Sequence, residues 1–292
     1  MPSSASSRLT NELVGGIMAF SSEVLSLEVN GHVATLWLDR PDARNAMGRE
    51  LFTDLPLAAK EVASNKDIRV LVIAAKGPAF TVGLDLKTMG GNLGASSNAK
   101  SSAVANSTFY DSILRMQDAN TCFSELKIPV IAAVHGYCLG GGIDLITACD
   151  IRLCSSDAVF SVREAKIAIV ADLGTLQRIP KIVSAGHVAE LAYTARDFDA
   201  AYAERIGLVN RVAGTNAESV LASAYELANE IAANSPLAVQ GTKSVLAAND
   251  GRTVEEGLKF VANWNALYIN SNDLKEAFTA VLERRPAVFK GD

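Results

Sequence analysis

Residues 129–152 read PVIAAVHGYCLGGGIDLITACDIR, and this stretch decides the fold. The run at 130–134 is apolar and partly β-branched, which is typical of a buried strand. Three consecutive glycines at 140–142 follow, and the apolar residues after them predict a buried helix at 143–148. Strand, glycine turn and helix in this order bring backbone N–H groups to a helix start, where they attract negative charge.

Asp144 lies just inside that predicted helix. Backbone donors beside a carboxylate are what a site needs in order to stabilise an oxyanion while it moves a proton. The Rossmann fingerprint fails because position 138 is Cys, and a P-loop fails because Ile143 and Asp144 follow the glycines. A structural alternative is that the glycines only permit tight packing and that Asp144 only complements the helix dipole.

Composition limits the class of protein. The chain has 292 residues and 49% hydrophobic residues, enough for one large α/β domain or two small ones. A net charge of −5 and a pI near 5.4 argue against a nucleic-acid partner, and no apolar run approaches the length of a membrane span. Four cysteines without a C-x-x-C pair and three scattered histidines predict no metal site and a reducing, cytosol-like compartment.

Elements alternate along the first two thirds of the chain. Strands are predicted at 24–29 and 33–38, around an Asn30-Gly31 turn, and at 70–75, 151–154 and 158–161; helices are predicted at 45–63 and 109–125, and residues 89–107 form a predicted mobile loop. From 185 onward the pattern is helical, at 185–194, 199–206, 217–233, 236–248, 254–269 and 274–283. This order predicts an α/β fold. We expect a disordered tail at 1–22, a catalytic core at 23–215 and a C-terminal helical region at 216–292.

Two further carboxylates occur at 162–176, where the sequence reads VREAKIAIVADLGTL. Asp172 follows five apolar residues, and an apolar environment raises the pKa of a carboxyl group toward the range that suits proton transfer. The alternatives are that Asp172 is the N-cap of a helix containing Leu176, and that Glu164 forms a salt bridge with Arg163 or Lys166. Three carboxylates near apolar or glycine-rich turns, without a metal or nucleotide motif, favour proton transfer.

GYCLGGGIDLITACDIR, with FTVGLDL at 80–86 and REAK…ADLGTLQRIPK downstream, resembles the crotonase (enoyl-CoA hydratase/isomerase) superfamily from about residue 24 to the C-terminus. The resemblance implies a crotonase-like spiral of ββα units with a C-terminal helical region that supports homotrimers, often paired into homohexamers. It implies an acyl-CoA thioester as substrate. No separate cofactor is expected, because coenzyme A is part of the substrate.

An apolar stripe in the C-terminal region bears on this assembly. Phe260, Val261, Trp264 and Tyr268 recur at helical spacing. Such a stripe usually means burial within the monomer, and the resemblance favours burial between copies instead.

The resemblance also implies where the substrate binds. Two backbone N–H groups hold the thioester oxygen in this family, and the matching positions are Leu84 and Gly141. The substrate-binding residues implied are Val82, Gly83, Leu84, Asp85, Leu86 and Gly141. We expect a side chain added at Gly141 to stand where the thioester oxygen approaches, and to meet a forbidden backbone angle.

The carboxylates Asp144, Glu164 and Asp172 discriminate within the superfamily. A typical hydratase has Glu at the positions of 144 and 164 and a small residue at that of 172. The set found here resembles members that isomerise 3,5-dienoyl-CoA to 2,4-dienoyl-CoA in fatty-acid beta-oxidation. By that resemblance Asp172 removes a C2 proton, Glu164 returns one at C6, and Asp144 polarises or orients the pair.

Other functions remain open from the sequence. They are an enoyl-CoA hydratase, a non-catalytic acyl-CoA-binding scaffold and, with less support, a decarboxylase or thioester hydrolase. Peroxisomal members of the family end in a Ser-Lys-Leu-type signal, whereas residues 289–292 read FKGD. We therefore expect a cytoplasmic enzyme, with no nucleic-acid or membrane partner.

Overall fold

Two sheets form the centre of the molecule in a computed structural model that describes residues 17–89 and 101–292. The larger sheet has seven strands in the order β1-β2-β3-β4-β5-β7-β10, and the smaller has the order β6-β8-β9. The strands are β1 (Ile17–Ser21), β2 (Leu25–Asn30), β3 (Val33–Leu38), β4 (Val70–Ala75), β5 (Val130–Val134), β6 (Tyr137–Leu139), β7 (Ile151–Cys154), β8 (Val159–Ser161), β9 (Phe198–Asp199) and β10 (Arg211–Val212).

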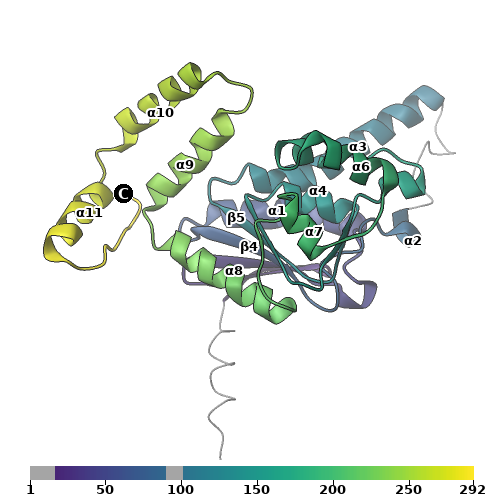
Figure 1. The fold of residues 1–292 in the computed structure, drawn as a ribbon, viewed down its shortest axis with the longest axis horizontal. Helices are drawn as coiled ribbons and strands as arrows, with labels where there is room; N and C mark the ends of the chain where they lie inside the picture. The colour runs from purple at the N-terminus through teal and green to yellow at the C-terminus, as the bar shows by residue number, and fades with distance from the viewer. Residues whose placement is uncertain (1–16, 90–100) are drawn as a thin grey trace, which may run out of the picture.

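Helices cover both faces of the larger sheet (Figure 1). The α-helices of the described residues are α1 (Arg49–Ser64), α2 (Leu86–Met89), α3 (Ser102–Ser124), α4 (Gly141–Thr147), α5 (Thr175–Arg178), α6 (Ala185–Thr194), α7 (Ala200–Arg205), α8 (Ala217–Ala232), α9 (Pro236–Ala248), α10 (Val254–Tyr268) and α11 (Asn272–Glu283). The predicted α/β class is confirmed.

Parallel pairing explains the continuous apolar strands. β3, β4, β5 and β7 pair in parallel, and every residue of β4 and β5 is buried. Such strands face covering helices on both sides, so they lack alternation between apolar and polar residues. On one face, α8 packs through small residues spaced four apart, at Val220, Ala224, Ala228 and Ala232. On the other face, α1, α3 and α4 enclose the larger part of the core.

Three predicted boundaries are wrong. Residues 17–21 form β1 rather than part of a disordered tail, because their backbone pairs with β2 although Ile17 and Met18 are exposed. Residues 1–16, also predicted to be tail, lie outside the described part of the chain. The helix predicted at 45–63 begins at Arg49, because Asn45 adopts a left-handed φ of 54° and uses its side chain to bond three backbone groups.

The third boundary concerns α3, which begins at Ser102 within the predicted loop at 89–107. The Ser101 side chain caps this helix by accepting from the Val104 N–H at 3.3 Å. Serine is a strong N-cap residue, and this is the local signal that the Ser-rich composition hid. Residues 90–100 of that loop lie outside the described residues.

Helices α9, α10 and α11 project from the core as a C-terminal lobe, whereas α8 lies against the sheet (Figure 1). Arg69 of the core holds the C-terminal segment by donating to the Phe289 carbonyl at 2.7 Å, and it also donates to the carbonyl of Ala232 at the end of α8 at 2.9 Å. Lys243 of α9 donates to the Ile128 carbonyl and to Asp150 of the core. Because α8 packs on the strands of the larger sheet, residues 217–232 belong structurally with the core.

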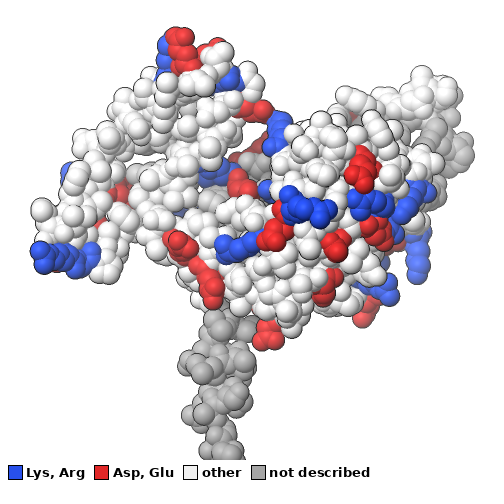
Figure 2. Space-filling view, in the orientation of Figure 1, with Lys and Arg blue, Asp and Glu red and all other residues white. Residues whose placement is uncertain are grey.

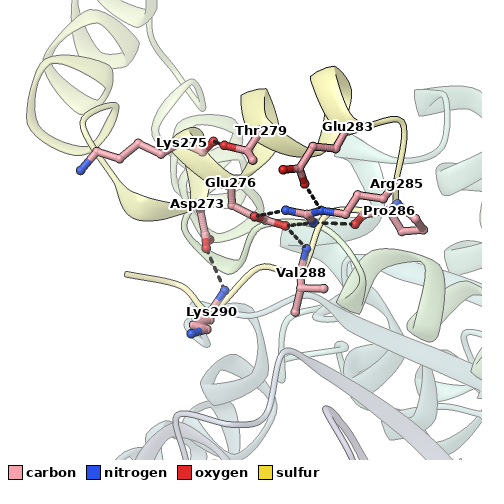
Figure 3. Close-up of polar contacts among 9 residues, drawn as sticks. All are labelled: Asp273, Lys275, Glu276, Thr279, Glu283, Arg285, Pro286, Val288 and Lys290. Carbon is pink, nitrogen blue, oxygen red and sulfur yellow. Dashed lines mark hydrogen bonds and ion pairs between the residues drawn. The ribbon is translucent and has the colours of Figure 1, made fainter.

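The last residues of the chain fold back onto α11 (Figure 3). Asp273 is buried, and its carboxylate accepts from the N–H groups of Lys290 at 2.8 Å and Gly291 at 3.1 Å, and from the Ser235 hydroxyl at 2.6 Å. Glu276 accepts from Arg285 at 2.5 Å and from the Val288 N–H at 2.8 Å. Two carboxylates of one helix thus fasten the tail.

We predict that Asp273→Asn loosens this tail. An amide presents one acceptor oxygen where the carboxylate uses two, and its NH₂ group faces donors, so we expect about 2 kcal/mol less stability for the tail. Hydrogen exchange at the backbone N–H groups of residues 287–292 measures the effect. Glu283→Gln, which changes an exposed partner of Arg285, is the control and should alter exchange little. Unchanged tail protection in Asp273→Asn would show that the buried contacts do not hold the tail.

Candidate active site

The glycine-rich turn connects the short strand β6 to α4. Gly140 has φ 51° and ψ −116°, a conformation that side-chain-bearing residues avoid, and it is the N-cap of α4 without a capping side chain. The backbone donors at the start of α4 are therefore available to a ligand. The forbidden angle expected at Gly141 is wrong: its φ is not positive, and a Cβ there would lie 2.7 Å from the Met47 Sδ.

A second backbone segment lies against this turn. The Thr81 N–H donates to the Tyr137 carbonyl at 2.9 Å, and the Leu139 N–H donates to the Thr81 carbonyl at 3.1 Å. A Cβ on Gly83 would come within 2.7 Å of the Leu139 carbonyl oxygen, so only glycine permits this approach. Residues 80–84 and 137–141 are thereby held side by side.

The two predicted donors lie on these neighbouring segments. Within residues 17–89 and 101–292, neither the Leu84 N–H nor the Gly141 N–H donates to a protein acceptor. Buried backbone N–H groups almost always find a partner. Two N–H groups without one, both on the wall of a cavity, are suited to hold an oxygen of a ligand.

The cavity has a volume of about 450 Å³, which is within the range of small-molecule sites. Its walls are mostly apolar. They are formed by Phe52, Val82, Gly83, Leu84, Leu86, Phe109, Ile113, Met116, Gly140, Gly141, Asp144, Arg163, Glu164, Ile167, Ile169, Val170, Asp172 and Leu173. All three predicted carboxylates thus reach one cavity from different elements.

Asp144 of α4 is the most buried of the three, at 1% exposure. One of its oxygens, Oδ1, accepts from the Thr175 N–H at 2.6 Å. Burial raises the pKa of Asp144 to about 6, although the Thr175 hydrogen bonds and the charge of Arg178 act to lower it.

Glu164 begins the short 3₁₀ helix η3 (Glu164–Ile167) and is 8% exposed. Its Oε2 has no hydrogen-bond partner among the residues that the structure describes. The salt bridge with Arg163 or Lys166 considered as an alternative is wrong, because among the described residues neither side chain pairs with Glu164, and Arg163 pairs with Asp197 instead. Burial, followed by repulsion from Asp144, raises the pKa of Glu164 to about 7.

Asp172 is half-buried on the segment before α5. Its backbone carbonyl accepts from the Gln117 Nε2 at 2.6 Å, and Arg178 donates to the adjacent Leu173 carbonyl at 3.3 Å. Gly174 is the N-cap of α5 and no side chain caps this helix, so the alternative capping role of Asp172 is wrong. Burial raises the pKa of the Asp172 carboxyl.

One predicted substrate-binding residue does not reach the cavity. The Asp85 carboxylate pairs with Arg40 at 3.0 Å and accepts from the Lys87 N–H at 3.1 Å, at the start of α2. Asp85 thus shapes the segment that carries Leu84 without lining the pocket. The other predicted positions, Val82, Gly83, Leu84, Leu86, Gly141 and the three carboxylates, all line it.

Sequence reasoning missed the apolar walls. Phe109, Ile113 and Met116 come from one side of α3, and Ile167, Ile169, Val170 and Leu173 come from the segment between Glu164 and α5. Spacing of three and four residues in α3 marks one helix face, but it does not say whether that face meets the core or a cavity.

Residues 17–89 and 101–292 contain no group of three or more His, Cys, Asp and Glu side chains placed to hold a metal ion. No helix in the same residues is long and apolar enough to cross a membrane.

Comparison with known proteins gives the class to which this fold and site belong. The profile of the enoyl-CoA hydratase/isomerase family matches residues 28–292, and the chain belongs to that family. A crystal structure of enoyl-CoA hydratase from Bacillus anthracis has a TM-score of 0.83 over 92% of this chain and 100% of its own, at 26% identity. The crotonase-like fold predicted from the glycine-rich stretch is confirmed.

Two relatives that are named as isomerases are more similar to this chain in sequence than that hydratase is. A peroxisomal Delta(3,5)-Delta(2,4)-dienoyl-CoA isomerase from Arabidopsis thaliana is 40% identical over 269 residues, covering 92% of this chain and 96% of the relative. A mitochondrial enzyme of the same name from Dictyostelium discoideum is 42% identical over 268 residues, covering 91% of each chain. The resemblance of Asp144, Glu164 and Asp172 to members of this kind was the prediction from the sequence, and these relatives agree with it.

We predict that Glu164→Gln gains stability relative to the wild type as the pH rises. With a pKa of about 7 in the folded state, Glu164 keeps its proton where the unfolded chain, with the ordinary value of 4.5, has lost it. The folded state then binds more protons between these two values. Wild-type stability therefore falls through this window, by about 1.4 kcal/mol for each pH unit.

Denaturant unfolding of both proteins from pH 4 to pH 8 checks this. The Gln variant should lack this loss, so the difference between the two proteins should grow from about pH 4.5 to about pH 7 and then level off. Glu61→Gln, an exposed change on α1, is the control and should follow the wild type. Parallel stability profiles of Glu164→Gln and the wild type would mean that Glu164 is ionised normally.

Proposed function

We propose that the protein is an isomerase that converts 3,5-dienoyl-CoA thioesters to 2,4-dienoyl-CoA thioesters by carboxylate-mediated proton transfer, as a step of fatty-acid beta-oxidation. The observation that carries the proposal is the convergence of Asp144, Glu164 and Asp172 on one apolar cavity whose wall also presents the Leu84 and Gly141 N–H groups. The relatives that bear the isomerase name support the same activity.

The first role of the site is to hold the thioester oxygen. A proton α to a thioester is weakly acidic, because its loss places negative charge on that oxygen. Donation from Leu84 and Gly141 stabilises this charge as it develops, and one such donor contributes roughly 3–4 kcal/mol. The intermediate is a dienolate whose charge extends along the conjugated carbons.

The second role is proton transfer at two separate carbons. Removal occurs at C2 and delivery at C6, four carbons away, which favours two carboxyl groups over a single shuttling one. Asp172 is half-buried and takes the C2 proton in its ionised form. Glu164, whose pKa burial raises to about 7, carries the proton that is delivered to C6.

Asp144 orients and polarises this pair. The Thr175 N–H fixes one of its oxygens, and its charge is one cause of the raised pKa of Glu164. Besides burial, repulsion from Asp144 and from Asp172 favours the protonated form of Glu164, so Asp144 helps to keep a proton on that carboxyl.

An enoyl-CoA hydratase is the second candidate, since the similar solved structure from Bacillus anthracis is an enzyme of that name. Addition of water requires room for a water molecule between the carboxylates at 144 and 164. Asp172 lines the same cavity and adds a third charge there, which disfavours that arrangement. Hydration of crotonyl-CoA, assayed beside dienoyl-CoA isomerisation, separates the two activities, and turnover of either substrate excludes a non-catalytic scaffold.

We predict that Asp172→Asn lowers the isomerisation rate about 10²–10⁴-fold, because the amide cannot accept the C2 proton. Substrate binding and thermal stability should change little, since the change is nearly isosteric. The ultraviolet absorption of the conjugated 2,4-dienoyl product follows the rate, and exchange of the C2 proton with deuterated solvent should fall in parallel. Asp118→Asn, an exposed change on α3 outside the cavity walls, is the control for loss of one negative charge, and it should retain C2 exchange. Full activity of Asp172→Asn would instead favour the hydratase-like pair Asp144 and Glu164.

The oligomeric state is part of the proposal. The apolar stripe predicted at 260–268 lies on α10 and turns partly inward, because Trp264 packs against Gly241 of α9. Other apolar side chains of the lobe are exposed, notably Leu267, Phe278, Val281 and Leu282. Figure 2 shows that the visible surface of this lobe is largely uncharged. Apolar surface of this extent favours burial against further copies, as a homotrimer or a pair of homotrimers.

We predict that light scattering at micromolar concentration gives a mass of three or six chains, and that Phe278→Glu combined with Leu282→Glu lowers it. Each change would place a charge in an interface between copies. Val170→Glu, an equally exposed apolar position on the core, is the control for a change of charge alone and should keep the wild-type mass. A wild-type monomer would contradict the proposed assembly.

A cytoplasmic location stays a prediction. The relatives named above are peroxisomal and mitochondrial proteins.

A further inference from the structure

Thr81 contacts both backbone segments that carry the proposed oxyanion donors. It is fully buried, and its own N–H and carbonyl pair with Tyr137 and Leu139 on the glycine-turn side. The segment around Leu84 and the segment around Gly141 thus meet at this residue. Thr81 is not part of the cavity wall, so it does not touch the substrate.

The Thr81 side chain strengthens this junction. Its hydroxyl donates to the Asn45 carbonyl at 2.6 Å and accepts from the Gly83 N–H at 3.1 Å. Its methyl group lies close to where a Cβ on Gly142 would stand, at 2.6 Å. One side chain therefore contacts the residue before Leu84 and the residue after Gly141.

The peptide group between Gly83 and Leu84 carries the Leu84 N–H, and its contacts fix the direction of that N–H. Its carbonyl oxygen accepts from the Met47 N–H at 2.8 Å. A trans peptide is planar, so its C=O and N–H point in opposite directions. Fixing the carbonyl on Met47 and the Gly83 N–H on Thr81 determines the direction of the Leu84 N–H. Gly83 has φ +81°, where glycine has freedom that must be restrained by contacts.

We propose that Thr81 is a positioning residue for the oxyanion hole, because it sets the spacing and direction of the Leu84 and Gly141 N–H groups. The inference rests on the proposed function, in which these groups hold the thioester oxygen. Donors of this kind must lie roughly 2.7–3.1 Å from the developing oxyanion, and roughly 0.5 Å of error reduces their effect. The hydroxyl restrains one donor segment and the methyl group restrains the other.

A purely structural role makes a different prediction. Buried threonines often use their hydroxyl to complete a local turn. In that case removing the hydroxyl lowers stability and leaves the turnover of the folded enzyme unchanged.

The experiment compares Thr81→Val and Thr81→Ser with the wild type in the full-length protein. Valine keeps the shape and removes the hydroxyl, and serine restores it. We expect Thr81→Val to lower kcat about 10- to 100-fold with little change in KM, since the oxygen is held less well mainly in the transition state. Thr81→Ser, which keeps the hydroxyl and loses the methyl group, should retain more of the rate than Thr81→Val. Should the valine variant fail to fold, Thr81→Ala is compared with Thr81→Ser, because these two variants differ only in the hydroxyl.

Thr35→Val is the matched control. Thr35 is also buried, and its hydroxyl bonds the Tyr225 hydroxyl at 3.0 Å on the face of the sheet covered by α8. Thr35→Val also loses a hydroxyl group, together with its one hydrogen bond, and Thr35 lies away from the cavity walls. We expect lower stability and an unchanged kcat. An equal kcat in the wild type, Thr81→Val and Thr35→Val would overturn the proposal.

A binding measurement separates this inference from the proposed function. Donation to the thioester oxygen draws charge along a conjugated acyl chain, so bound 2,4-dienoyl-CoA should absorb at longer wavelength than the free thioester. The shift should be present in the wild type and Thr35→Val and smaller in Thr81→Val, without any turnover. A wild type that shows the shift but does not isomerise 3,5-dienoyl-CoA would refute the function and leave the role of Thr81 intact. Equal shifts in the wild type and Thr81→Val, or no shift in the wild type, would refute the role of Thr81.

Discussion

The contact between residues 80–84 and 137–141 is the constraint on which the site depends. Hydrogen bonds on both sides of Thr81 hold these segments together, and glycine at 83 and 142 lets them approach closely. The left-handed Gly140 then turns the chain into α4. This one contact brings the two proposed donor N–H groups and the Asp144 carboxylate to one cavity, because Gly141 and Asp144 follow directly from the turn and Leu84 lies on the segment packed against it.

The three carboxyl groups of the cavity differ in burial, and burial raises the pKa of a carboxyl group. The apolar walls raise the pKa of all three, and they raise that of Glu164 to about 7, where one carboxylate oxygen has no partner among the described residues. Asp172 is only half-buried and keeps more contact with water. A site that holds one carboxyl protonated and another ionised near neutral pH can remove and deliver protons in one cycle.

Local pattern made part of the fold and of the site predictable from the sequence. The parallel strands were visible as apolar runs, the hairpin as Asn30-Gly31, and the site as glycines and carboxylates in one order along the chain. The short strands β6, β9 and β10 were not predicted, because β9 and β10 have only two residues each and β6 lies between the turn glycines 136 and 140, and all three pair only once the fold exists. The direction of Asp85 depends on Arg40, 45 residues away, and the apolar walls depend on how α3 crosses the cavity.

The location of deuterium in the product tests the division of labour between the carboxylates most directly. A single turnover of protiated 3,5-dienoyl-CoA in deuterated water should place solvent deuterium at C6, because the proton delivered by Glu164 exchanges with solvent before the substrate binds. The hydrogen lost from C2 should not appear there, since Asp172 takes it. Transfer of the C2 hydrogen to C6 within one molecule would show that a single group carries the proton, and it would contradict the assignment of separate base and acid.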